Sequence, residues 1–345
     1  MHAVVIHGVE DFRYEEVPTP KAGKEEVVVK VKKCGVCAAD PKIYYGKAYF
    51  KTRIPIIAGH EFIGDIVELG PGAAQKFGLE IGDKAIAEQI VPCGECYYCK
   101  RGLYHLCEVH HIFDVLGPDG GWAEYTKYPN KSLIWKVPND IPDRAGVAIE
   151  PLSCAIHGVE RGNIGLDDTV VVIGDGTIGL LMLQVARLKN PKKLILIGHH
   201  DHRLKIGKEL GADLTVNSEA QDVASLVKDQ TERLGCDVVL EASGNPSAVE
   251  QAVDMLRKRG KLIVFGVFSN KASIDYSIIS DIKELEIIGG HLGAYKYPLA
   301  IKYLSEGLVK VDKIVTHDLP LKDFKSAIET AHKKLDNAIK VVMTP

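Results

Sequence analysis

Four cysteines in a short stretch are the first feature of the chain that could do chemistry. Cys93, Cys96, Cys99 and Cys107 follow the pattern C-x2-C-x2-C-x7-C. Four thiolates at this spacing can close tetrahedrally around one Zn²⁺, which leaves no coordination position for a substrate. Disulfides are the alternative, but clustered cysteines without a secretory signal at the start of the sequence favour metal. The pattern predicts a structural zinc in a lobe at residues 90–110.

A second set of possible ligands is dispersed along the chain and is chemically mixed. Cys37 lies in the segment CGVCAAD, His60 and Glu61 lie in GHEFIG, and Glu150 opens EPL. A thiolate, an imidazole and a carboxylate can form a three-ligand zinc site with an open position for substrate or water. Zinc at such a site lowers the pKa of a bound hydroxyl. The set therefore predicts a catalytic zinc, although each residue taken alone would more often be structural.

A glycine-rich motif indicates a nucleotide site. Residues 174–179 read GDGTIG, follow a β-branched run at 169–173 and open a helical pattern at 178–188. In the context of strand, turn and helix, G-x-G-x-x-G is the fingerprint of dinucleotide binding. The glycines allow a tight turn, close approach of a pyrophosphate and close packing of helix on strand, and the helix N-terminus attracts the anion. The predicted binding residues are Gly174, Gly176, Thr177, Ile178 and Gly179.

The end of the second strand bears on which nucleotide binds. An acidic residue is expected there when the ribose 2′-hydroxyl of NAD is recognised, but Gly198 follows the run at 194–197. Glycine removes the carboxylate that would repel a 2′-phosphate. Three possible donors to such a phosphate follow: His199, His200 and Arg203. The segment favours NADP over NAD, unless it is only a solvated loop or Asp201 reaches the ribose instead.

The elements that must position these residues fall into two regions. Residues 1–139 contain short β-type runs separated by glycine and proline, which predicts an antiparallel barrel. From about residue 156, strand-like runs alternate with helical patterns, which predicts a doubly wound parallel sheet. We expect a discontinuous catalytic domain at 1–155 and 290–345 and a Rossmann domain at 156–289. The runs in the first region lie at 3–6, 26–33, 63–69, 84–86 and 123–128.

Composition narrows the class of protein. The chain has 345 residues and a net charge of −3, which suits two domains and gives no reason to expect nucleic acid as a partner. No apolar run reaches the roughly 20 residues of a membrane span. The cysteine pattern favours a reducing, cytoplasmic compartment. We expect the partner to be a small-molecule substrate.

These motifs together resemble one family. The segment GHEFIGDIVELG at 59–70 is similar to the zinc signature of the medium-chain dehydrogenase/reductase family, and the four-Cys lobe, the Rossmann motif and the EPLS segment occur in the matching order. The chain looks most like the polyol dehydrogenases (sorbitol, threitol or erythritol) and threonine dehydrogenase. The resemblance implies a GroES-like catalytic domain beside the Rossmann domain, two zinc ions per chain, and a homo-oligomer, either a dimer or a homotetramer.

The resemblance also implies roles for single residues. Cys37, His60 and Glu150 would ligate the catalytic zinc, and Glu61 would ligate it intermittently. Asp40 would fix the tautomer of His60. Lys340 matches a basic position that contacts the cofactor in family members, and a solvated surface lysine is the alternative.

The chain departs from the family at the proton relay. Ala39 stands where a Ser or Thr commonly passes on the alcohol proton, and Lys42 stands where a His is often found. We expect Glu61 or Glu150 to accept the proton first, since carboxylates next to Zn²⁺ remain ionised, with Lys42 as the weaker candidate. Aromatic candidates for the pocket wall are Tyr44, Tyr45, Tyr49, Phe50, Phe113 and Trp122.

The leading interpretation is a zinc-dependent dehydrogenase that transfers hydride between NADP and a polyol or related secondary alcohol. Oxidation of a threonine-like amino alcohol or of an aldose is the enzymatic alternative. A zinc-stapled NADP(H)-binding protein without turnover is the alternative from another class, and the missing relay hydroxyl is its support.

Overall fold

The computed structural model describes residues 1–48, 51–109 and 111–345, and the chain divides into two compact units. Unit 1 comprises residues 1–150, 297–307 and 311–345, and unit 2 comprises 151–296 and 308–310. The sequence placed these boundaries at 155/156 and 289/290. Helix α4 (Ile149–Gly162) runs continuously across the first boundary, so no linker marks it in the sequence.

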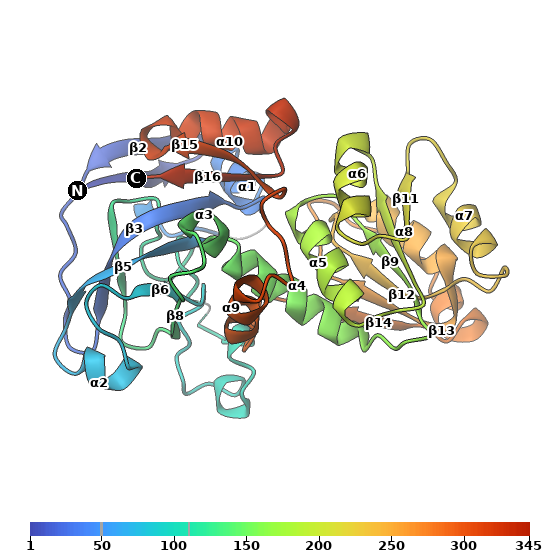
Figure 1. Ribbon diagram of the computed structural model, residues 1–345, viewed down its shortest axis with the longest axis horizontal. Helices are drawn as coiled ribbons and strands as arrows, with labels where there is room; N and C mark the ends of the chain where they lie inside the picture. Colours follow the sequence, from blue (N-terminus) through green and yellow to red (C-terminus); the bar gives the residue numbers. More distant parts are fainter. Residues whose placement is uncertain (49–50, 110) are drawn as a thin grey trace. The chain divides into compact units, whose positions relative to one another are not determined.

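Unit 1 is built on β-structure (Figure 1). A seven-stranded sheet has the order β15-β16-β3-β5-β6-β8, with β7 paired to β3, and a three-stranded sheet has the order β2-β1-β4. All pairs are antiparallel except β15 with β16. The strands are β1 (His2–Gly8), β2 (Asp11–Glu16), β3 (Val27–Val36), β4 (Ile56–Ile57), β5 (Phe62–Leu69), β6 (Lys84–Ala87), β7 (Tyr125–Tyr128), β8 (Ile134–Lys136), β15 (Val315–Pro320) and β16 (Lys340–Thr344).

Short helices complete unit 1. The α-helices are α1 (Ala39–Tyr44), α2 (Ala73–Phe77), α3 (Asp143–Gly146), α9 (Tyr297–Ser305) and α10 (Phe324–Lys333). Single 3-10 turns occur at η1 (Cys99–Arg101), η2 (Tyr104–Leu106), η4 (Leu321–Asp323) and η5 (Leu335–Asn337).

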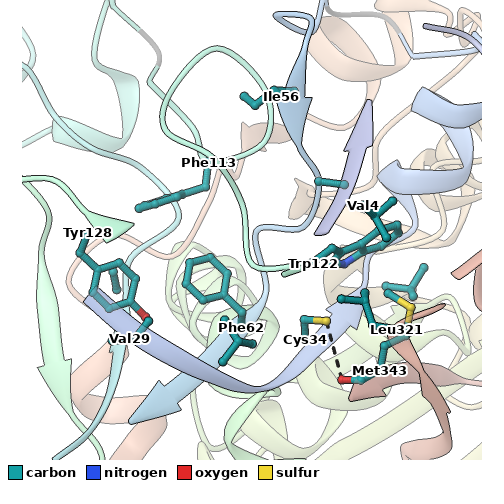
Figure 2. Packing of buried hydrophobic residues seen from close by; sticks show 14 of the residues in the cluster. Val4, Val29, Cys34, Ile56, Phe62, Phe113, Trp122, Tyr128, Leu321 and Met343 are labelled. Atoms are coloured by element: carbon teal, nitrogen blue, oxygen red, sulfur yellow. Dashed lines mark hydrogen bonds between the residues drawn. The ribbon is translucent and has the colours of Figure 1, made fainter. Parts of the chain in front are cut away.

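Aromatic side chains fill the core of unit 1. Phe62, Phe113 and Tyr128 contact one another, with ring centroids 5.6 to 6.1 Å apart, and Trp122 lies in the same cluster (Figure 2). Because Phe113 and Trp122 are fully buried, they contribute to core packing and not to a pocket wall. Of the other wall candidates, Tyr44 packs edge-on against Phe12 and Tyr45, and Tyr49 and Phe50 lie outside the described residues.

Unit 2 is a six-stranded parallel sheet with the order β11-β10-β9-β12-β13-β14. Alternate residues of β10 show that both faces are covered. Ile195 and Ile197 pack in the core that includes α7 and α8, whereas Leu196 lies against α6. The elements are β9 (Thr169–Ile173), α5 (Thr177–Leu188), β10 (Lys193–Gly198), α6 (Asp201–Glu209), β11 (Leu214–Asn217), α7 (Val223–Asp229), β12 (Cys236–Glu241), α8 (Pro246–Met255), β13 (Leu256–Val264), η3 (Ile278–Ile282) and β14 (Glu286–Gly289).

A buried carboxyl ties the cysteine lobe to the sheet of unit 1. Glu88 follows β6, and its oxygens accept hydrogen bonds from Tyr104 Oη at 2.7 Å and Trp135 Nε1 at 3.2 Å. Tyr104 belongs to the lobe, whereas Trp135 belongs to β8. The helices of the described part of the chain are too short or too polar to span a bilayer.

The Glu88 anchor predicts a pH-dependent stability. Burial raises the pKa of Glu88 from 4.5 to about 7, despite its two hydrogen bonds. The folded value lies above the unfolded one, so the contribution to stability is complete below pH 4.5 and is lost as pH rises through 7. The E88Q variant should therefore gain on the order of 3 kcal/mol relative to wild type between these limits. Urea denaturation across this range measures the difference, with E95Q, an exposed glutamate of the same lobe, as control. If the free energy of unfolding changed equally with pH in wild type and in E88Q, the prediction would be wrong.

Candidate metal centres and cofactor site

The four lobe cysteines converge on one point. Their Sγ atoms lie within 4.8 Å of one another, with Cys93 3.9 Å from Cys99 and Cys96 4.0 Å from Cys107. A disulfide would bring two sulfurs to about 2.05 Å, whereas four sulfurs around Zn²⁺ at 2.3 Å stand roughly 3.8 Å apart. The spacing fits a tetrahedral zinc and excludes disulfides among these four residues.

Backbone N–H groups of the lobe also favour thiolates. Cys93 Sγ accepts from the N–H groups of Glu95 and Cys96 at 3.4 and 3.3 Å, and Cys107 Sγ accepts from Cys93 at 3.4 Å. Hydrogen bonds from the backbone of Cys99 and Glu108 lower the pKa of Cys96 to about 6. The donor set is therefore chemically suited to hold a cation.

Strand pairing assembles the second centre. Cys37 follows β3, and His60 and Glu61 precede β5; these strands are antiparallel neighbours, with Cys34 opposite Phe62. The Gly35 N–H donates to the Glu61 carbonyl at 2.7 Å, which extends the pairing to the ends of both strands. As a result, ligand atoms of Cys37, His60 and Glu61 lie within 4.8 Å of one another.

Gly59 gives His60 its position. Its φ is +91°, and a Cβ there would stand 2.0 Å from Trp122 Cδ1, so a side chain has neither a relaxed backbone nor space. The Gly59 N–H donates to Asp114 Oδ2 at 2.7 Å. Glycine before the histidine thus lets the turn pass directly over the buried tryptophan.

Asp114 orients His60, and Asp40, the residue expected in that role, lies in the same cluster. The distance from His60 Nδ1 to Asp114 Oδ2 is 3.1 Å, which leaves Nε2 as the nitrogen for a metal. Asp40 also accepts the backbone N–H of Cys37 at 2.7 Å. Asp114 lies far from His60 in sequence and in no recognisable motif, so only the fold could reveal it. Although burial lowers the pKa of His60, Asp114 and Cys37 together raise it well above 6.5.

Lys340 lies at this centre and not on the surface. It begins β16, pairs with the Glu61 carboxylate, and donates to the Val36 carbonyl at 3.0 Å. Both charged side chains are 3% exposed. Burial lowers the pKa of Lys340, but Glu61 and Cys37 raise it by a larger amount.

Glu150 stands apart from the Cys37–His60–Glu61 group. Its Oε1 accepts from Gln89 Nε2 at 2.5 Å, and Gln89 Oε1 accepts from Tyr297 Oη at 2.7 Å. All three side chains are buried. The structure therefore brings together three of the four expected ligands, and Gln89, itself bonded to Tyr297, holds the fourth.

The two positions where a relay residue was expected, Ala39 and Lys42, lie in α1. Ala39 is its first residue, and Lys42 is a partly buried residue of its last turn. Burial raises the pKa of Cys37, so this thiol needs a cation to persist as a thiolate. A partly buried thiol, a partly buried imidazole oriented by a carboxylate, and a second, buried carboxylate match the donor chemistry of a catalytic Zn²⁺.

The glycine-rich loop has the expected geometry. Gly174 follows β9 with φ +122°, and α5 begins at Thr177 after the cap residue Gly176. A Cβ on Gly179 would stand 1.8 Å from the Gly174 carbonyl oxygen. The helix N-terminus is thus available to a pyrophosphate, as the motif predicts.

The sequence did not single out Asp175, the second residue of this loop. Its Oδ2 accepts the backbone N–H groups of His199 and His200 at 3.0 and 2.8 Å, and His200 Nδ1 lies 3.0 Å away. Arg203 is 4% exposed and lies 3.8 Å from Asp175 Oδ1. Arg203 therefore balances the charge of Asp175 in this structure, and His199 is the exposed member of the expected donors.

Comparison with known proteins agrees with both units. The family described as "Alcohol dehydrogenase GroES-like domain" matches residues 23–139, and "Zinc-binding dehydrogenase" matches residues 177–306. An erythritol/L-threitol dehydrogenase of Mycolicibacterium smegmatis is 42% identical, over 100% of this chain and 98% of its own. An L-threonine 3-dehydrogenase of Pyrococcus furiosus is 37% identical, over 88% of this chain and 86% of its own.

A solved structure shares the whole fold. A putative zinc-binding dehydrogenase from Sinorhizobium meliloti, bound to NADP, has a TM-score of 0.93 and 28% identity, and the match covers 100% of this chain and 99% of that one. Since family models match both units and a relative 42% identical spans the full length, the chain belongs to the zinc-dependent medium-chain dehydrogenases and is an oxidoreductase that acts on secondary alcohols.

Proposed function

We propose that this protein oxidises a polyol or related secondary alcohol to the ketone, with NADP preferred to NAD. The observation that carries the proposal is the convergence of Cys37, His60 and Glu61, with His60 oriented by Asp114, in a chain 42% identical to an erythritol/L-threitol dehydrogenase. A protein that only bound the nucleotide would gain nothing from this second donor set.

Two zinc ions per chain fit the two donor sets. The lobe thiols would hold a structural ion, and Cys37 and His60 would hold a catalytic ion with Glu61 or Glu150 as the third ligand. When bound, the catalytic zinc supplies a Lewis acid that lowers the pKa of a substrate hydroxyl, and the nicotinamide accepts hydride.

The protein's carboxylates replace the missing relay hydroxyl. Ala39 has no hydroxyl, so a carboxylate oxygen of Glu61 or Glu150 accepts the substrate proton in this proposal. Lys340 pairs with Glu61, and Gln89 holds Glu150, so both carboxylates are fixed before substrate arrives. Lys340 thereby acts through Glu61, in addition to the cofactor contact that the family resemblance implies, and Lys42 remains the weaker relay candidate.

Three observations support the choice of NADP as the preferred cofactor. Gly198 places no carboxylate at the end of β10, His199 is exposed beside it, and one structural relative binds NADP. Another, an alcohol dehydrogenase of Escherichia coli CFT073, is complexed with NADH, so NAD is retained as the second cofactor. The threonine dehydrogenase relatives keep an amino alcohol as the alternative substrate.

Assembly and location complete the proposal. The protein forms a dimer or homotetramer, supported by β14, which lies at one edge of the six-stranded sheet with Ile287 partly exposed. A cytoplasmic location is supported by the eight cysteines, none of which forms a disulfide.

The two metals should separate by function. Wild type should contain two zinc ions per chain. C37S should lose one of them together with turnover and keep a near-native Tm, whereas C96S should lose the other and unfold at lower temperature, because a structural zinc contributes folding energy. Atomic emission measures the zinc content, calorimetry measures the Tm, and steady-state assays measure the turnover of the same preparations. A single zinc in carefully purified wild type would contradict the two-site interpretation.

Asp114 should control the catalytic zinc through His60. D114N keeps the shape of the side chain at a position with φ +60°, which Asn tolerates, but removes the charge that orients the imidazole. We expect about 10- to 100-fold weaker zinc binding at this centre, measured by competition with a chromophoric chelator. Asp119 lies on the same loop and is half exposed, so D119N is the matched control. Equal zinc affinity in D114N and wild type would show that Asp114 has no such role.

A substrate panel tests the proposal as a whole. Tetritols, sorbitol, a 2,3-diol, threonine and aldoses should be assayed with NADP and with NAD. A polyol with NADP should give the highest kcat/KM. If threonine or an aldose gave the highest kcat/KM, the proposed substrate class would be wrong. Comparable kcat/KM values with NADP and NAD would overturn the proposed preference for NADP. Tight NADPH binding without turnover on any substrate would favour the non-enzymatic alternative.

A further inference from the structure

Asp175 lies beneath the segment expected to select the cofactor. It is a buried carboxylate, 3% exposed, that accepts both backbone N–H groups of the histidine pair and faces Nδ1 of His200. These donors lower the pKa of Asp175, although burial opposes them. The two imidazoles stand with centroids 4.0 Å apart, so fixing one constrains the other.

We propose that Asp175 is a positioning residue that holds His199 and His200 in place to recognise the 2′-phosphate of the cofactor. This inference rests on the proposed NADP preference and names the residue that organises it. Because Nδ1 of His200 faces Asp175, Nε2 is the ring nitrogen that points away from the carboxylate. A carboxylate fixes the ring orientation and tautomer of a histidine in the same way at metal sites.

Neighbouring hydrogen-bond donors and a guanidinium compensate the negative charge of Asp175. Three donors converge on Oδ2, and the buried guanidinium of Arg203 lies 3.8 Å from Oδ1. A bare carboxylate at this point would repel a phosphate, as the acidic residue of NAD-specific Rossmann folds does. Its compensation by Arg203 allows a negative residue to support an anion site.

Gly198 is coupled to the same residue. A Cβ at position 198 would stand 2.6 Å from Asp175 Cβ and 2.6 Å from its Oδ2. Gly198 therefore makes room for the Asp175 side chain. A carboxylate introduced at 198 alone would displace Asp175, so G198D is not a clean route to NAD specificity.

The test compares two small probes of the adenosine end of the cofactor. Calorimetry measures the Kd of 2′,5′-ADP and of 5′-AMP, which differ only in the 2′-phosphate, for wild type, D175N and D175A. Wild type should prefer 2′,5′-ADP. Both variants should bind 2′,5′-ADP at least about tenfold more weakly, because an orienting charged hydrogen bond is lost, with 5′-AMP little changed.

The direction of the change separates positioning from plain electrostatics. Removal of a negative charge near a phosphate should by itself strengthen the binding of 2′,5′-ADP. A lower or unchanged Kd for 2′,5′-ADP in both variants therefore overturns the inference. D201N removes a charge one residue beyond the pair, where Asp201 bonds Asn217, and should leave the ratio of the two Kd values unchanged. A collapse of the ratio in D201N alone would assign the role to Asp201.

Two further outcomes are distinguishable. Equal affinity of wild type for the two probes overturns the proposed cofactor preference and this inference with it. If D175A fails to fold, D175N decides, because its side chain has nearly the same size; thermal unfolding of each variant identifies that case. G198A provides an independent check, since its Cβ displaces Asp175 without removing its charge, and it should weaken 2′,5′-ADP selectively.

Discussion

The antiparallel pairing of β3 with β5 is the interaction on which the catalytic centre depends. It places the residue after one strand beside the residues before the other, so a thiol meets an imidazole and a carboxylate that lie more than 20 positions further along the chain. The hydrogen bond from Gly35 to Glu61 extends the ladder to this point, and β16 pairs with β3 on its other side. Strand β3 thus positions both the candidate ligand Cys37 and the cation Lys340.

Burial of charge is the cost of this arrangement, and each buried charge has a local partner. Glu61 faces Lys340, His60 faces Asp114, and Asp175 in unit 2 faces Arg203 and the histidine pair. An unpaired charge at such depth would cost several kcal/mol. The same pairs fix the orientation of the side chains in the candidate sites, so one set of contacts serves both stability and the proposed function.

The family shares its chemistry through the metal and cofactor, and this chain varies what surrounds them. Ala39 and Lys42 remove the usual relay residues, while Gln89 and Tyr297 fix Glu150 from another direction. Asp175 and Gly198 form a matched pair at the nucleotide site, in which the side chain of one fills the space that the other leaves. In a fold that serves many substrates, function depends on local features of this kind.

Local patterns in the sequence determined the parallel sheet of unit 2, the glycine-rich loop and the four-Cys lobe, because each depends on residues close together in the chain. Four cysteines at this spacing can close around one ion, and near-continuous apolar runs are typical of strands covered on both faces. Tertiary structure alone decided the partners of the buried charges. Asp114 reaches His60 across 54 positions, Lys340 reaches Glu61 across 279, and Asp175 reaches His200 across 25. No periodicity or motif encodes such contacts, because they depend on which strands pair and on how loops between them pack.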